Sequence, residues 1–171
     1  MPINTDPERG MQLERLMKQY GTDLLRLCAM MLKDAELARD AVQDTFIRAY
    51  RAMDRYRGEA SEKTYLTAIA VNVCRDYLKS AWLRHKSPVD LDRLPEEASA
   101  FDFPDDTVLS EVMRLPRSYR EVVLLRFYED MKLSEIAKAL HSPIGRVRTR
   151  LNRANAILRE KLKEWYYDED Q

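Results

Sequence analysis

Apolar residues recur three and four positions apart through most of the chain, which is the spacing of amphipathic helices. The first such segments, one over residues 11–20 and one after Gly21, predict two separate core helices. Asp34 can cap a third helix that runs to about Met53, and Ser61 can cap a fourth. The first half of the chain is therefore predicted to form a small helical domain.

A second group of helices is predicted in the last third of the chain. One starts near Val108 and stops before Pro116, which can itself open the next helix. The buried side of that next helix is expected to hold Tyr119, Val122, Val123, Leu125 and Phe127. A further helix should begin at Ser134, with Ile136, Ala137 and Leu140 directed inward. His141 occupies the following turn, and Ser142, followed by a proline, signals the start of the final helix.

Between these groups, residues 87–104 read SPVDLDRLPEEASAFDFP, with three prolines and no sustained apolar period. This composition predicts an extended, acidic linker. We therefore expect an all-α protein with two small helical domains, residues 1–86 and residues 105–171. A passive tether is the usual role of such a linker, and its negative charge indicates that it avoids DNA.

The net charge of zero conceals an uneven distribution. Residues 1–86 hold 15 basic and 12 acidic residues, for a net charge of +3. Residues 87–113 hold one and eight, for −7, and residues 114–165 hold 13 and six, for +7. A basic C-terminal block behind an acidic connector is typical of a nucleic-acid-binding module joined to a second domain.

The composition, 45% hydrophobic and 34% charged, is typical of a soluble globular protein. No apolar run approaches the roughly 20 residues that span a bilayer, and the N-terminus lacks the pattern of a signal peptide. A cytoplasmic protein without membrane insertion is expected. Cys28 and Cys74 are isolated at apolar helical positions, which favours core positions over a disulfide or metal site. We expect no cofactor and no enzyme, because the chain contains no phosphate loop, metal-ligand spacing or nucleophile constellation.

The final predicted helix is the most informative. An apolar stripe is formed by Val147, Leu151, Ala154, Leu158 and Leu162. Arg146, Arg150 and Arg153 share a second face, and Arg148 lies on a third. A short helix, a tight turn and a longer helix with arginines near its start is the helix-turn-helix pattern, in which the second helix reads base edges in the major groove. The alternative is a surface helix that is merely rich in arginine.

The helix predicted after Asp34 presents a mixed exposed band, formed by Asp40, Gln43, Asp44, Ile47, Arg48 and Arg51. This band is either a solvated face, in which an Asp44–Arg48 pair contributes about 0.3 kcal/mol, or a partner surface. The apolar side chain of Ile47 among charges favours a partner surface.

Residues 55–77 open with an Arg-Tyr-Gly turn and continue as a helix. Its apolar positions are Leu66, Ile69, Ala70, Val73, Cys74 and Tyr77, and its other face carries Lys63, Thr67, Asn72, Arg75 and Lys79. Aromatic rings beside cations suit a site that holds a backbone phosphate and stacks an unpaired base. An ordinary amphipathic helix with a solvated basic face remains the alternative.

Three stretches together resemble the extracytoplasmic-function (group 4) sigma factors of the sigma-70 family of bacterial RNA polymerase. They are DAELARDAVQDTFIRAYRAMDRYRGEAS, KTYLTAIAVNVCRDYL and LPRSYREVVLLRFYEDMKLSEIAKALHSPIGRVRTRLNRA. The resemblance implies a protein that binds core RNA polymerase, recognises the minus-35 and minus-ten promoter elements and promotes DNA melting. It further implies contacts with the clamp helices of the largest polymerase subunit and with the beta flap, a linker that follows the nucleic-acid path, and an anti-sigma factor, which in this family is often membrane-bound.

The same resemblance implies roles for individual residues. Core polymerase binding is implied for Asp40, Gln43, Asp44, Phe46, Ile47, Arg48 and Arg51. Minus-ten binding and melting are implied for Tyr56, Arg57, Ser61, Lys63, Thr64, Tyr65, Asn72 and Arg75. Minus-35 binding is implied for Ser142, Arg146, Arg148, Thr149, Arg150 and Arg153.

Several positions depart from the usual family text, namely Glu62, Tyr65, Ala68, His141 and Arg146. At His141, where glycine is common, the turn is expected to need a left-handed residue. A different class of protein, a helix-turn-helix regulator with a sensory first domain that acts without replacing sigma, is the alternative function. The charged docking helix and the aromatic, basic loop favour a sigma factor over such a sensor.

Overall fold

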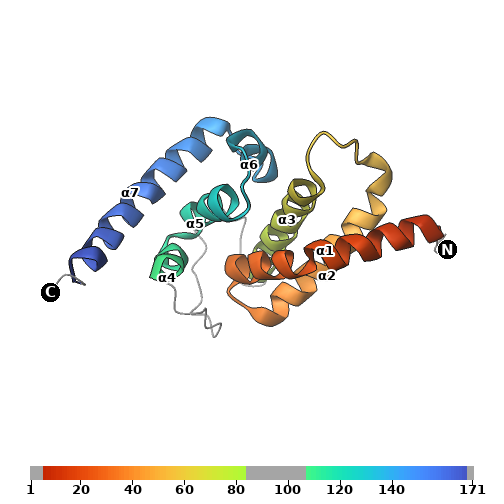
Figure 1. Cartoon of the computed structure of the whole chain (residues 1–171), viewed down its shortest axis with the longest axis horizontal. Coiled ribbons are helices and arrows are strands. Elements are labelled where there is room, and N and C mark those ends of the chain that lie inside the picture. Colours follow the sequence, from red (N-terminus) through yellow and green to blue (C-terminus); the bar gives the residue numbers. More distant parts are fainter. Residues whose placement is uncertain (1–5, 84–106, 169–171) are drawn as a thin grey trace. The chain divides into compact units, whose positions relative to one another are not determined.

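The computed structural model describes residues 6–83 and 107–168, and every regular element in these two ranges is helical (Figure 1). The chain divides into two compact units with the boundary at Ser80. The expected all-α, two-domain architecture is confirmed. The predicted linker, residues 87–104, lies outside the described residues. No helix in the described parts of the chain is long and apolar enough to cross a membrane.

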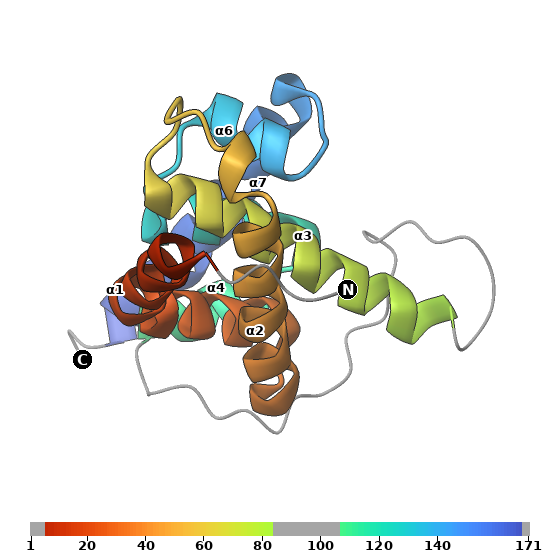
Figure 2. The same ribbon diagram turned by 90° about the vertical axis from the view of Figure 1, so that its right-hand side faces the viewer.

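The first unit contains α1 (Pro7–Leu32), α2 (Ala35–Arg51), a short 3₁₀ helix (Met53–Arg55) and α3 (Glu62–Leu83). Figure 2 shows α1 and α2 side by side, with α2 leading up to the turn before α3. α1 continues through Gly21, so the predicted break between two helices is wrong. A glycine inside a helix costs only about 1 kcal/mol, and the burial of Leu16 before it and Leu24 after it outweighs that cost.

The helix starts in this unit follow the sequence closely. The Leu37 N–H donates to the Asp34 carboxylate (3.0 Å), and the Thr64 N–H donates to the Ser61 hydroxyl (3.1 Å), so both predicted caps are confirmed. Cys28 and Cys74 are both buried in the core, as expected. Thr67, expected on the polar face of α3, is instead buried.

The second unit contains α4 (Thr107–Arg114), α5 (Arg117–Val123), a π-helical turn (Leu124–Tyr128), α6 (Leu133–Ala139) and α7 (Ile144–Asp168). Arg120 is only 1% exposed, and its guanidinium donates to the Leu115 carbonyl (3.3 Å), which anchors the turn that ends α4. The π turn changes the face that its residues present. Its wider hydrogen bond, from the Glu129 N–H to the Leu124 carbonyl (3.0 Å), leaves Phe127 58% exposed, so its predicted burial is wrong.

Two predicted helix starts in this unit are also wrong. α6 begins at Leu133, one residue before Ser134, because the Glu135 carboxylate accepts a hydrogen bond from the Lys132 N–H (2.9 Å) and stabilises the earlier start. At the start of α7, the Pro143 carbonyl accepts the first helical hydrogen bonds. The Ser142 hydroxyl is buried and has no hydrogen-bond partner among the described residues, so it does not cap α7.

The turn between α6 and α7 has the hydrogen bonds of a Schellman motif. The Ser142 N–H donates to the Ala137 carbonyl (3.0 Å), and the His141 N–H donates to the Lys138 carbonyl (3.2 Å). His141 has φ 50°, so the expected left-handed residue is confirmed. This turn changes the direction of the chain and joins α6 and α7 as a helix-turn-helix.

Candidate nucleic-acid interface

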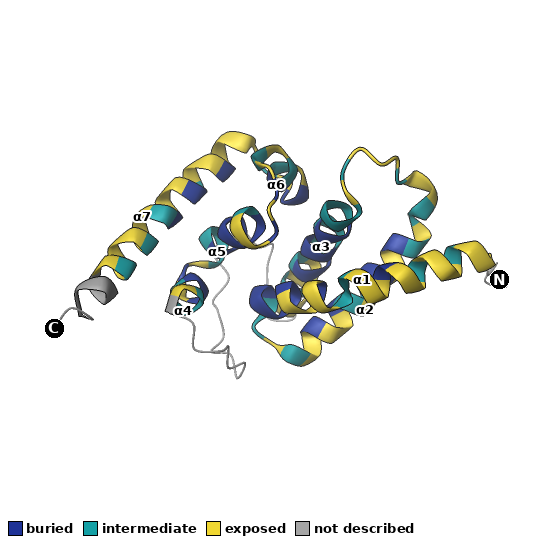
Figure 3. Ribbon diagram, in the orientation of Figure 1, coloured by how far each residue is buried: buried dark blue, intermediate teal, exposed yellow. Residues whose placement is uncertain are grey.

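α7 separates a buried stripe from a polar face (Figure 3). Val147, Leu151 and Ala154 are buried, as predicted. Since successive helical residues turn by about 100°, Thr149 lies opposite this stripe. The Thr149 side chain is exposed, and its hydroxyl donates to the Gly145 carbonyl (2.9 Å).

The four predicted arginines differ in their exposure and in their position around α7 relative to Thr149. Arg146 and Arg153 flank it on one side and Arg148 on the other, and all three side chains are exposed. Arg150 lies at the border with the buried stripe, is half-buried and makes contacts within the protein. Ser142 is half-buried in the turn before α7. The exposed face is therefore centred on Thr149 with Arg146, Arg148 and Arg153 around it.

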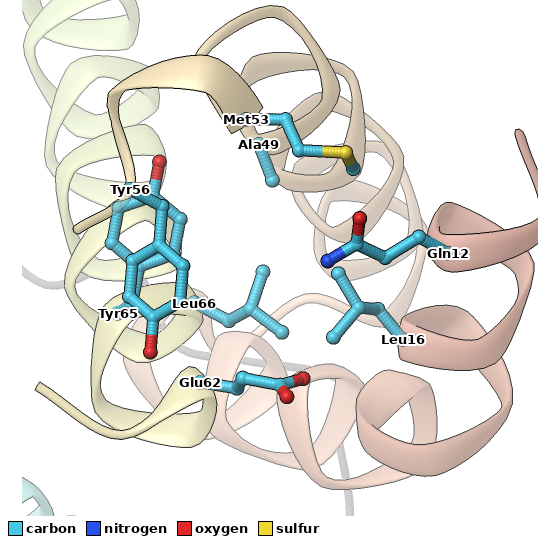
Figure 4. A pocket seen from close by; sticks show the side chains of 8 residues that line it. All are labelled: Gln12, Leu16, Ala49, Met53, Tyr56, Glu62, Tyr65 and Leu66. Carbon is cyan, nitrogen blue, oxygen red and sulfur yellow. The ribbon is translucent and has the colours of Figure 1, made fainter. Parts of the chain in front are cut away.

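In the first unit, Tyr56 of the loop between α2 and α3 packs against Tyr65 in the first turn of α3. The ring centroids of Tyr56 and Tyr65 lie 4.6 Å apart with an interplanar angle of 38° (Figure 4). The Tyr56 hydroxyl donates to the Ala60 carbonyl and the Tyr65 hydroxyl to the Ala52 carbonyl. Burial raises the pKa of both tyrosines, so both are neutral donors at physiological pH. Gly58, with φ 74°, permits the bend of the loop between them.

The other predicted minus-ten residues do not all join this pair. Asn72 lies two turns after Tyr65 on nearly the same face of α3, and Arg75 follows one turn later. The Asn72 side chain donates to the Ala68 carbonyl of its own helix (3.0 Å). Lys63 lies about 160° around α3 from Tyr65, so these two residues do not share a face.

The remaining loop residues are Arg57, Ser61 and Thr64. Arg57 is exposed. Ser61 forms the cap of α3, and its hydroxyl also donates to the Thr64 hydroxyl (3.0 Å). Ser61 and Thr64 therefore fix the start of α3, whereas Arg57 extends into solvent.

The band predicted on α2 is largely exposed. Exposed side chains are those of Asp40, Gln43, Ile47, Arg48 and Arg51. Phe46 is 4% exposed, so its side chain belongs to the core and not to the band. Asp44 is half-buried, because it accepts a hydrogen bond from the Tyr77 hydroxyl.

Two side chains of α3 contact residues of this band. Arg48 pairs with Asp76 (3.1 Å), one residue before Tyr77. Burial and the hydrogen bond to Asp44 raise the pKa of Tyr77. Neither partner was predicted from the sequence: Asp44 and Tyr77 are separated by 33 positions, and the expected intrahelical partner of Asp44 was Arg48. Only the packing of α2 on α3 brings these groups together.

A small cavity of about 20 Å³ lies beside the tyrosine pair. Gln12 and Leu16 of α1, Ala49 of α2 and Glu62 and Leu66 of α3 are among the residues that line it (Figure 4). This volume is close to that of one water molecule and is too small for a nucleobase. The described residues contain no group of three or more candidate metal ligands.

Comparison with known proteins identifies the family. Residues 16–84 match the model "Sigma-70 region 2" and residues 106–157 match "Sigma-70, region 4". The chain is 30% identical over 166 residues to the RNA polymerase sigma-H factor of Pseudomonas aeruginosa, covering 86% of this chain and 84% of that protein. It is 34% identical over 142 residues to the ECF RNA polymerase sigma-E factor of Escherichia coli K12, covering 72% and 73%.

Solved structures show the same fold. The sigma factor RpoE, in complex with the anti-sigma factor NepR from Bartonella quintana, has a TM-score of 0.67 at 19% identity, covering 89% of this chain and 97% of that chain. CnrH, in complex with the cytosolic domain of CnrY, has a TM-score of 0.60 at 26% identity, covering 89% and 88%.

These matches and the two helical units define a bacterial transcription initiation factor. The chain belongs to the sigma-70 family, in its extracytoplasmic-function group, and is a sigma factor. The class suggested by the resemblance is thereby confirmed. The alternative, a regulator that acts without replacing sigma, does not account for a region 2 match across the first unit.

Proposed function

We propose that this sigma factor divides promoter recognition between its two units, with α7 reading the minus-35 element and residues 55–77 capturing the minus-ten strand. The observation that carries the proposal is the exposed face of α7, where Thr149 is surrounded by Arg146, Arg148 and Arg153. Arginine forks bind guanine edges or phosphates, and the Thr149 methyl group can contact thymine. In a helix-turn-helix the second helix is the one that enters the major groove, and α7 is that second helix, which supports the proposal.

Strand capture is proposed for the tyrosine pair and the face of α3 beyond it. Stacking of an unpaired base on an aromatic ring contributes about 1–3 kcal/mol, which offsets the few kcal/mol needed to extrude a base. The cavity beside the pair is too small for a base, so the base is proposed to stack on an outer ring face of Tyr56 or Tyr65. Asn72 and Arg75 then meet the backbone that follows, and Arg57 adds a cation from the loop.

Docking on the clamp helices of the largest polymerase subunit is proposed for the exposed band of α2. Ile47 is an apolar centre among charges, which suits a desolvated contact inside a polar rim. Asp44 and Arg48 are held by Tyr77 and Asp76, so their side chains have less freedom to lose on docking. Phe46 supports this surface from the core. A contact between the second unit and the beta flap is proposed on the family resemblance alone.

Regulation and location are proposed from the relatives. The structural relatives RpoE and CnrH were solved with the anti-sigma factor NepR and with the cytosolic domain of CnrY, respectively. We propose that an anti-sigma factor also holds this chain and that the chain works in the cytoplasm, at the membrane when so held. Its role is binding rather than catalysis, since promoter melting requires no bond chemistry from the factor itself.

Run-off transcription with core polymerase and a library of bacterial upstream regions tests the proposal. The holoenzyme should initiate from promoters that core alone ignores. Arg146→Ala should weaken recognition of the upstream element, and Asn72→Ala should impair opening more than initial docking. Arg159→Ala, an exposed arginine later on α7, is the matched control and should behave as the wild type. Tight binding of duplex DNA without any initiation by core would contradict the sigma assignment, and equal loss at both steps in both variants would contradict the separate roles.

A further inference from the structure

The first turns of α1 contact the segment proposed to capture the minus-ten strand. One Arg9 amino group donates to the Tyr50 carbonyl at the end of α2 (2.8 Å), and the other pairs with Asp54 of the 3₁₀ helix (3.4 Å). The same guanidinium lies over the Tyr50 ring, 5.1 Å from its centroid. Arg9 therefore contacts the last turn of α2, at Tyr50, and also Asp54, which lies two residues before Tyr56.

Arg15 makes a second contact, on the far side of the loop. One of its amino groups binds the Glu62 carboxylate (2.9 Å), and the other donates to the Gln19 side chain of α1 (3.2 Å). Glu62 is the first residue of α3 and follows the cap residue Ser61. Arg15 is thus fixed on its own helix and holds the chain at the point where the loop ends.

The side chains between the two arginines fill the space under the loop. Gln12 and Leu16 point into the small cavity that Tyr56, Tyr65 and Glu62 line from the other side (Figure 4). Arg9 and Arg15 are six residues apart, or about 9 Å along a helix. One rigid helix therefore spans the loop from its beginning to its end, with an ion pair at each end.

We infer that the first turns of α1 brace the loop between α2 and α3 (residues 52–61), here called the strand-capture loop. Arg9 and Arg15 are then positioning residues for promoter opening. The inference rests on the proposed role of residues 55–77. Both residues lie before the region 2 match, which starts at residue 16. Their partners are 41 to 47 positions away in the sequence.

The physical effect of the brace is to order the loop before DNA arrives. A loop that is already ordered loses less conformational entropy on binding, so more of the stacking energy is available to hold the extruded base. Arg9 and Arg15 need not touch the DNA, since they act through Tyr50, Asp54 and Glu62. Removing them should weaken opening without removing any group that contacts a base.

Open-complex formation by the reconstituted holoenzyme tests the brace. The variants are Arg9→Gln and Arg15→Gln. The matched control is Lys18→Gln, which removes an equal charge from the same helix; the partner of Lys18 is Glu14 of α1 itself (3.1 Å). Permanganate reactivity of the opened strand on duplex promoter should fall about three- to tenfold in each arginine variant. On a premelted template, where no base has to be unstacked, both variants should stay within about twofold of the wild type. Affinity for core polymerase should not change.

Two further variants separate positioning from folding. Arg15→Lys keeps the charge and should recover most of the activity. The exchange Arg15→Glu with Glu62→Arg should be more active than either single change, because it restores the ion pair across the loop.

The outcomes are distinguishable from those of the proposed function. If the wild type opens no promoter with core polymerase, the proposed function fails. If the wild type opens promoters but Arg9→Gln and Arg15→Gln open them equally well, the brace is refuted. It is also refuted if these variants lose equal activity on duplex and premelted templates, since that result indicates general damage to the unit.

Discussion

Replacing Arg146 or Arg153 by alanine should weaken minus-35 binding in two different ways, although both lie on the exposed face of α7. Arg146 is the third residue of the helix and Arg153 the tenth. Seven residues correspond to about 10 Å along the helix axis, which approaches the roughly 12 Å width of the major groove. If the start of α7 reaches the base edges, Arg153 then reaches the phosphates at the edge of the groove.

The expected magnitudes follow from these positions. Arg146→Ala should cost about 1–3 kcal/mol on the preferred minus-35 sequence and much less on a scrambled one. Arg153→Ala should weaken binding to both sequences alike. It should also reduce the slope of log affinity against log salt by about 0.9, because one phosphate contact is lost. Raising the salt fourfold should then cost the wild type about 3.5-fold more affinity than it costs this variant.

Fluorescence anisotropy of holoenzyme on labelled minus-35 duplexes, measured over a series of salt concentrations, gives both quantities. Arg159→Ala is the control for the loss of one positive charge, since Arg159 is exposed on the same helix six residues, or about 9 Å, after Arg153. The reasoning would be refuted if Arg146→Ala and Arg153→Ala produced the same loss on both sequences and the same change of slope. The two arginines would then contribute only general positive charge.

Three further predictions concern stability. Gly21→Ala should raise the free energy of unfolding by about 1 kcal/mol, since Gly21 lies inside α1 with no atom within 4 Å of an added Cβ. Gly58→Ala should lower the free energy of unfolding by about 1–2 kcal/mol, because φ is 74° at Gly58. Urea denaturation measures both, and equal effects would contradict the backbone conformations described for the two glycines. The raised pKa of Tyr77 means that the unfolded chain loses this proton first, so the stabilisation is complete below about pH 10 and declines above it. Tyr77→Phe should therefore flatten the stability profile between about pH 10 and 11, and parallel profiles for the two proteins would show that Tyr77 is not the group involved. Ile136→Ala, in the fully buried side of α6, should cost about 2–5 kcal/mol and reduce minus-35 binding, with Lys138→Ala on the exposed side as the control; a similar melting temperature for both variants would contradict the packing described for α6.

Capping residues and prolines predicted where α2, α3 and α5 begin. Asp34 and Ser61 cap α2 and α3 with their side chains, and Pro116 precedes α5, as expected. His141 has the left-handed conformation expected from the family text. The errors occur where the hydrogen-bond pattern departs from a regular helix. The π turn exposes Phe127 because it adds a residue to one turn, and apolar spacing alone does not reveal this change of register.

For the candidate sites, the sequence predicted which residues share a helix face but not every case of burial. The arginine face of α7 is visible in the sequence because helical spacing alone sets which residues share a face. The burial of Thr67, which was expected on the polar face of α3, depends on which side of that helix meets its neighbours. The roles of individual residues toward promoter and polymerase remain proposals.

The sequence by itself determined the helical class, the two units, most helix boundaries and the polar face of α7, because caps, prolines and apolar spacing act within a few residues of one another. Only the tertiary structure decided which distant side chains meet. Tyr77 supports Asp44. Such pairs leave no local pattern, since the packing of whole helices determines which charged side chain finds which partner.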